Sequence, residues 1–143
     1  MGVAFLTDAD EGLTVTVWHG DVSAREWRAQ VETLVQSRDW QFGPRFLSDI
    51  RTAGDVSSID DDDVNEMADR FAEAVSETPG IRVAVVAADL FDGARGFELE
   101  VERHGVQTGV FGDVGDACAW LGVDQRAAEH SIDRLRRYIR STS

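Results

Sequence analysis

The stretch of residues 81–121 most constrains what this chain can fold into. It begins with "IRVAVVAA", which is apolar at nearly every position after Arg82. That pattern is typical of a strand buried on both faces of a parallel sheet. An amphipathic helix, a second short strand at residues 106–111 and the segment "FGDVGDACAWLG" follow without a break. A strand, a helix and a strand in this order predict an α/β architecture with crossover connections.

The same alternation runs through the rest of the chain. Period-two and short apolar runs predict further strands at residues 3–6, 13–18 and 45–51. Apolar residues at helical spacing predict helices around Val31, after Asp60, and after Asp124. The first two strands form a hairpin, so one of them lies antiparallel at a sheet edge. We therefore expect an α/β fold: a mostly parallel sheet of about five strands with an antiparallel edge strand, helices packed around it, and an extra C-terminal helix.

Composition excludes several classes of partner. With 143 residues the chain fits one domain, and its net charge of −13 argues against binding to nucleic acid or to an anionic membrane surface. No apolar run approaches the roughly 20 residues that a membrane-spanning helix needs, so we expect no membrane insertion. The single cysteine, Cys118, suits a reducing cytoplasm and is expected to be a small buried hydrophobe.

The end of the chain differs in charge from the rest. Residues 125–143 hold five arginines and two carboxylates, a net of +3. The predicted helix there carries an apolar row that must be covered, either by its own domain or by another protein. If it is covered by a partner, which could be a second copy of the chain or an unknown protein, the partner face would comprise Ile132, Leu135, Arg136 and Ile139.

The segments "IRVAVVAADLF", "ARGFE" and "DVGDACAWLGV", with the strand that ends at Phe111, resemble the SpoIIAA-like branch of the STAS-type fold. Members of this bacterial group close with a strand, an acidic turn and an Ala-x-x-Trp-Leu helix, to which residues 117–121 correspond. The resemblance covers about residues 10–123. It implies a SpoIIAA-like domain at residues 1–123, followed by an Arg-rich amphipathic helix at residues 124–143. It also implies a non-catalytic protein that regulates through protein association.

The resemblance further implies a phosphorylated serine at a helix start after a central strand. Ser57 and Ser58 stand in that region, and an ungapped count from Ile50 brings Ser58 to the acceptor position. Alignment on the Ile59-Asp60 pair instead brings Asp61 there. The Asp-Ser-Ser-Gly pattern of the family is absent, and the aspartates at residues 60–63 would repel a phosphate.

Those aspartates also raise the question of a metal site. Together with Asp55 they offer the oxygen ligands that magnesium and calcium prefer. Their spacing does not match a calcium-binding loop, and carboxylates in a first helical turn cap free amides and oppose the helix dipole. Capping is the interpretation we favour, and no metal is predicted.

No catalytic or cofactor motif is present in the sequence. His19, His104 and His130 show no ligand spacing with one another or with Cys118, and neither a nucleophile elbow nor a glycine-rich phosphate loop occurs. We expect no enzymatic activity and no cofactor.

Two locations for a ligand follow from the fold. Ligands of open α/β sheets bind beyond the carboxyl ends of the strands, which points to Asp49, Arg51, Asp89, Phe91 and Asp113. In addition, the aromatic residues Trp18, Trp27, Trp40 and Phe42 could line an apolar cavity. Two functions therefore remain open: regulation through protein association, and binding of a small apolar or lipid-like ligand between sheet and helices.

Overall fold

The computed structural model describes residues 2–37, 39–88 and 91–142. In chain order its elements are β1 (Val3–Asp8), β2 (Leu13–Gly20), α1 (Ala24–Gln36), the 3₁₀ helix η1 (Asp39–Phe42), β3 (Arg45–Ala53), α2 (Asp61–Val75), β4 (Arg82–Val86), α3 (Phe91–Glu102), β5 (Gln107–Phe111), α4 (Val114–Leu121) and α5 (Gln125–Thr142). The predicted strands are all present, and their boundaries differ from the predicted ones by one or two residues.

The five strands form one sheet in the order β1-β2-β3-β4-β5. β1 pairs antiparallel with β2, and the other three pairs are parallel. The predicted mixed sheet with an antiparallel edge strand is therefore confirmed. Because neighbours in the sheet are also neighbours in the sequence, each crossover between parallel strands contains a single α-helix.

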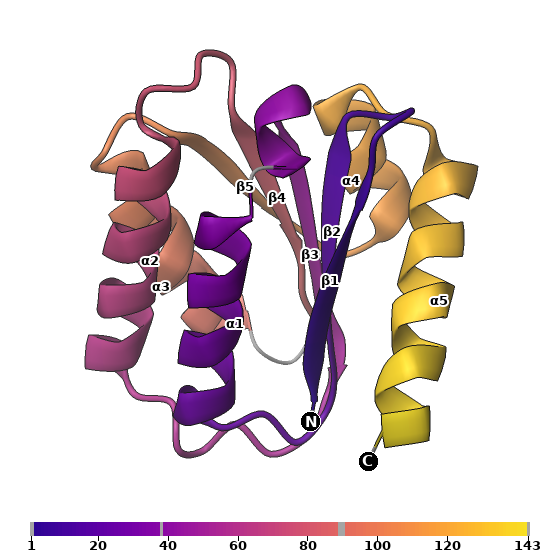
Figure 1. The fold of residues 1–143 in the computed structure, drawn as a ribbon. Coiled ribbons are helices and arrows are strands. Elements are labelled where there is room, and N and C mark those ends of the chain that lie inside the picture. The colour runs from indigo at the N-terminus through magenta and orange to yellow at the C-terminus, as the bar shows by residue number, and fades with distance from the viewer. Residues whose placement is uncertain (1, 38, 89–90, 143) are drawn as a thin grey trace.

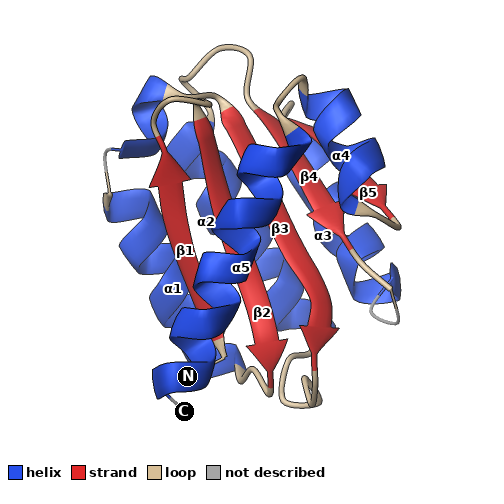
Figure 2. Cartoon of the chain, turned by 90° about the vertical axis from the view of Figure 1, so that its right-hand side faces the viewer, coloured by secondary structure: helices blue, strands red, loops and turns tan. Residues whose placement is uncertain are grey.

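Helices cover both faces of this sheet. Helices α1, α2 and α3 lie on one face, and α4 and α5 lie on the other (Figure 1). Figure 2 shows α5 running across β1, β2 and β3. Alternate residues of each strand thus enter two separate apolar layers, which we call the α1–α3 layer and the α4–α5 layer. Among the helices that the structure describes, none is long and apolar enough to cross a membrane.

The last helix packs on its own domain. Ile132, Leu135 and Ile139 are 2%, 5% and 1% exposed, and all belong to the apolar cluster beneath α5. Of the two alternatives that the sequence leaves open, the structure has the one in which the helix packs on its own domain, so these three side chains do not form an exposed partner face. The row is covered in the same chain, because it packs on the apolar face that β1 and β2 present on the α4–α5 side of the sheet.

Local sequence signals set the starts of the helices. Ser23 caps α1 in a capping box with Glu26, and Asp60 caps α2 in a capping box with Asp63. Asp113 caps α4, where its side chain accepts a hydrogen bond from the Asp116 amide. The capping interpretation of the aspartates at the start of α2 is therefore confirmed for Asp60 and Asp63.

Candidate functional site

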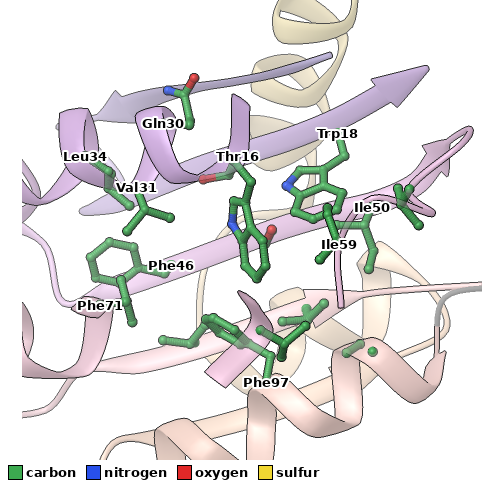
Figure 3. Close-up of a pocket in the computed structure, with 18 of the residues that line it drawn as sticks. Thr16, Trp18, Gln30, Val31, Leu34, Phe46, Ile50, Ile59, Phe71 and Phe97 are labelled. Atoms are coloured by element: carbon green, nitrogen blue, oxygen red, sulfur yellow. The ribbon is translucent and has the colours of Figure 1, made fainter. Parts of the chain in front are cut away.

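A cavity of about 300 Å³ lies in the α1–α3 layer, between these helices and the sheet (Figure 3). Its volume is at the lower end of the range for small-molecule sites, about 300–1,000 Å³. Most of its lining is apolar and comes from β1 to β4, the three helices and the loop before α2. The lining residues are Phe5, Thr16, Trp18, Trp27, Gln30, Val31, Leu34, Phe46, Leu47, Ser48, Ile50, Val56, Ile59, Asp60, Asp61, Val64, Phe71, Val83, Val85, Gly93, Ala94 and Phe97.

The floor of the cavity contains two hydroxyl groups. Thr16 of β2 and Ser48 of β3 are paired in the register of the two strands, and both line the cavity. Within the described part of the chain, neither hydroxyl has a hydrogen-bond partner. Phe5 and Val85 occupy the paired positions on the outer sides of this row. The centre of the sheet therefore presents two adjacent hydroxyls, without a protein partner among the described residues, to a mostly apolar space.

Aromatic rings form much of the wall. Trp18 and Trp27 meet edge to face with ring centroids 5.2 Å apart. Trp27 lies 6.2 Å from Phe97, and Phe97 lies 6.3 Å from Phe71, so the rings form a continuous chain from β2 across α1 and α3 to α2. Such edge-to-face and tilted contacts stabilise each ring position. The wall is therefore held by ring-to-ring contacts in addition to backbone structure.

Two of the four aromatic residues predicted to line a cavity do so. Trp18 and Trp27 are in the lining, whereas Trp40 is buried against Phe46, 6.2 Å away, and is not. The buried indole N–H of Trp40 has no hydrogen-bond partner among the described residues. The side chain of Phe42 lies outside what the structure describes.

The cavity opens at the starts of α2 and α3. Its exposed lining residues are Asp60, Asp61 and Gly93, which lie beside the carboxyl ends of β3 and β4. The opening is thus at the strand ends, where the fold predicts a ligand, but on the side of the α1–α3 layer. Two carboxylates at the opening make its rim acidic.

The two candidate phospho-acceptors lie in the loop next to this opening. Ser57 and Ser58 are exposed, and Val56 and Ile59 on either side of them line the cavity. The Ser58 hydroxyl accepts a hydrogen bond from the Ala24 amide at 3.2 Å, which ties the loop to the start of α1. Phosphorylation of either serine stays a prediction.

The strand-end residues gather on the opposite face of the sheet. Asp49 is fully buried, and its carboxylate accepts hydrogen bonds from Arg51 Nε at 2.9 Å and Nη2 at 2.8 Å. It also accepts one from Arg136 Nη2 at 2.8 Å. The hydrogen bond to Asp49 is the largest cause that raises the pKa of Arg51, and the charges of Asp113 and Glu129 add to it.

Of the candidate strand-end residues, Asp49 and Arg51 are hydrogen-bonded to each other, and the charge of Asp113 acts on Arg51. Arg136 of α5, which was not among the candidates, joins them on Asp49. Asp89 lies outside the described residues, and so does the side chain of Phe91. The Asp49 carboxylate faces away from the cavity and is taken up by two guanidinium groups. This arrangement, which we call the Asp49 cluster, fastens α5 to β3 and leaves no room on Asp49 for a ligand.

A comparison with solved structures supports the predicted fold. The chain is similar to an uncharacterised protein from the DUF3478 family with a SpoIIAA-like fold, from Shewanella loihica PV-4. The match has a TM-score of 0.55 and 17% sequence identity, and it covers 84% of this chain and 93% of that chain. The SpoIIAA-like fold predicted from residues 81–121 is thus confirmed. No protein-family model matches the sequence, and no curated protein matches it.

Proposed function

We propose that this chain is a non-catalytic SpoIIAA-like domain that binds a small apolar ligand in the cavity of the α1–α3 layer. The observation that carries the proposal is the pair of free hydroxyls, Thr16 and Ser48, on the floor of an aromatic-lined space. A closely packed interior fills such a space with apolar side chains. Here the space is unfilled, and the two half-buried hydroxyls on its floor are open to a ligand. An apolar ligand with one hydroxyl or carbonyl group would fill the cavity and form a hydrogen bond with one of the two hydroxyls.

The dimensions set the size of this ligand. A cavity of about 150 Å³ in a protein interior is enough for benzene, and the cavity here measures about 300 Å³. A ligand about twice the size of benzene, or a longer chain that extends through the opening, fits it. The acidic rim at Asp60 and Asp61 disfavours a carboxylate or phosphate at the opening. We therefore expect a neutral ligand such as a medium-chain alcohol or a small aromatic ketone.

The test uses a neutral fluorescent naphthylamine, whose emission rises in apolar surroundings. We expect one molecule to bind per chain and to quench the tryptophan emission of Trp18 and Trp27. Ser48→Ile fills the floor and should abolish binding. The matched control is Thr108→Val, since Thr108 of β5 does not line the cavity. If wild type does not bind the probe, or Ser48→Ile binds it equally well, the proposal is wrong.

The hydroxyl pair has its own test in competition experiments. A medium-chain alcohol should displace the probe from wild type, and Thr16→Val should weaken that competition about three- to tenfold, the value of one hydrogen bond. The affinity of the naphthylamine itself should stay the same, because it does not need the hydroxyl. Native mass spectrometry of freshly purified protein adds an independent measure: a retained species of a few hundred daltons supports a ligand, and a clean apo mass opposes a tightly held one.

The second candidate function is regulation through protein association. The SpoIIAA-like fold supports it, as do two large exposed hydrophobic side chains, Leu99 on α3 (62% exposed) and Tyr138 on α5 (53% exposed). Leu99→Glu and Tyr138→Glu should then each weaken self-association or capture of a protein partner, measured by light scattering and pull-down. Unchanged behaviour of both variants would remove the support that these side chains lend. The buried thiol of Cys118 is compatible with a reducing compartment, and we place the protein in the cytoplasm.

A further inference from the structure

Three potential metal ligands converge where α2 meets the end of α3. They are Asp69 on α2, Glu100 on α3 and His104 in the turn that follows α3. One ligand atom from each lies within 4.8 Å of the other two, and His104 Nε2 lies 2.9 Å from Asp69 Oδ1. This group is outside the cavity and outside the Asp49 cluster. Neither proposed function makes use of it.

The backbone holds these side chains together. Glu100 and His104 are four residues apart, so they project from the same side of the helix end. The His104 amide donates to the Val101 carbonyl, which continues the turn, and Gly105 then leaves it with a φ of +83°. On α2, Asp69 follows the fully buried Ala68, and on α3, Glu100 precedes the fully buried Val101. The three ligands thus stand beside tightly packed positions.

The geometry suits a transition metal ion. Ligand atoms about 2.0–2.1 Å from a tetrahedral zinc ion are separated from each other by about 3.3 Å. The 2.9 Å between His104 Nε2 and Asp69 Oδ1 must open by a few tenths of an ångström, and a carboxylate oxygen of Glu100 already lies within 4.8 Å of both atoms. One imidazole and two carboxylates satisfy zinc and its neighbours in the periodic table, whereas magnesium and calcium prefer oxygen ligands alone. Water would complete the coordination on the exposed side.

The charges around the group also favour a cation. Two carboxylates converge there, on a chain with a net charge of −13. At present Arg103 pairs with Glu100 at 2.9 Å, but the Arg103 side chain is 75% exposed and can turn into solvent. A divalent ion would take its place between the carboxylates. Arg103 therefore competes with a metal and should limit the affinity to the micromolar range.

We propose that Asp69, Glu100 and His104 form a binding site for a divalent transition metal ion of the zinc class, which joins α2 to α3. Both helices form walls of the cavity through Phe71 and Phe97. A metal at this position would fix the spacing of the two walls without entering the cavity. The proposal stands on the ligand geometry and does not depend on ligand binding in the cavity.

The experiment is calorimetric titration of zinc chloride into chelator-treated protein. We expect one ion per chain with a dissociation constant on the order of 10 μM, and retention of binding in excess magnesium. Asp69→Asn and His104→Gln should each weaken binding at least about tenfold, a loss comparable to that seen when groups supporting a metal site are changed. His130→Gln is the matched control, because His130 is an exposed histidine on α5, which lies on the opposite face of the sheet from α2 and α3 (Figure 1).

A fourth variant separates a built site from adventitious binding. Arg103→Gln removes the competing cation and should tighten zinc binding several-fold. Circular dichroism verifies that each variant is folded. Absence of binding to wild type overturns the proposal, and so does binding that His104→Gln leaves unchanged. Equal affinity of Arg103→Gln and wild type would contradict the place assigned to Glu100.

Discussion

Removal of the buried carboxylate at Asp49 is expected to destabilise this protein more than any change at a surface ion pair. The Asp49 side chain has no exposed area, and it accepts hydrogen bonds from Arg51 and from Arg136. In Asp49→Ala, both guanidinium groups lose their buried partner. Breaking a buried pair in this way typically costs about 3–5 kcal/mol, because an uncompensated charge is left behind.

The structure narrows that range. The Arg51 side chain is 31% exposed and that of Arg136 is 20% exposed, so both guanidinium groups can partly turn toward water. Asp113 and Glu129 also interact with Arg51 and remain in place. These features place the loss near the lower limit, at about 3 kcal/mol. Arg136→Met should cost less than Asp49→Ala, because the carboxylate keeps its two-pronged contact with Arg51.

Urea unfolding followed by circular dichroism measures this loss. With a slope of about 1.5–2 kcal/mol per molar urea, a loss of 3 kcal/mol lowers the midpoint by about 1.5–2 M. Glu66→Gln is the control, since the Arg28–Glu66 pair is exposed on both sides, and its midpoint should stay at the wild-type value. If Asp49→Ala shifts the midpoint as little as Glu66→Gln does, the Asp49 cluster does not fasten α5 to β3 and the reasoning fails.

Three further predictions concern α5, the start of α1 and the cysteine. Leu135→Ala should lower the free energy of unfolding by about 2–5 kcal/mol, because Leu135 lies on the buried side of α5 and is only 5% exposed. A loss below about 1 kcal/mol, measured by urea unfolding, would contradict the packing of α5 on its own chain. Hydrogen bonds from the backbone lower the pKa of Glu26, first that of Gly2 and then that of Ser23. The Glu26 carboxylate therefore stabilises the folded state fully above its unfolded pKa of about 4.5. This stabilisation is lost as the pH falls through the lower pKa of Glu26 in the folded state. The difference in thermal midpoint between wild type and Glu26→Gln should be largest at neutral pH and vanish in acid, and a difference that grows in acid would refute this sign. Burial raises the pKa of Cys118 to about 11, so at pH 8 the native thiol holds far less of the reactive thiolate than a free thiol does. Iodoacetamide should therefore modify Cys118 slowly in the native state and rapidly in urea, and equal rates would show that it is not buried.

Most of the fold could be predicted from local sequence patterns. The run after Arg82 is apolar because β4 is buried on both faces. The alternation at residues 13–18 arises because Leu13, Val15 and Val17 enter the α4–α5 layer. On the other face of β2, Thr14 is hydrogen-bonded to Thr7 and Thr16 lines the cavity. The start of α2 was also readable, since Asp60 caps this helix together with its neighbour Asp63. These signals work because the interactions that produce them lie within a few residues of each other.

The sites were harder to predict because their parts come from distant segments. Arg136 meets Asp49 across 87 positions of the chain. The charge of α5 alone therefore does not indicate that one of its five arginines, Arg136, closes an internal ion cluster. Similarly, the spacing of Glu100 and His104 is a local signal for a metal, but only the packing of α2 on α3 adds Asp69.

The cavity could not be predicted from the sequence for a different reason. The pairing of Thr16 with Ser48 depends on the register of β2 and β3, which no single segment encodes. Aromatic residues can be recognised in a sequence, whereas an unfilled volume is what remains after all side chains have packed. This difference explains why Trp18 and Trp27 line the cavity and Trp40, of the same residue type, does not.

The position of α5 across β1 and β2 determines which apolar surface stays exposed while the chain is being synthesised. Each strand of the sheet can pair with the strand synthesised just before it. The apolar face formed by Leu13, Val15 and Val17 nevertheless stays uncovered until the residues of α5 leave the ribosome, more than 100 positions later. During synthesis the chain therefore passes through a stage in which the sheet can form while one of its apolar faces is exposed to solvent. Such a state is prone to aggregate or to bind a chaperone. Packing of α5 on the sheet covers this apolar face and so ends the stage at which the chain is prone to aggregate.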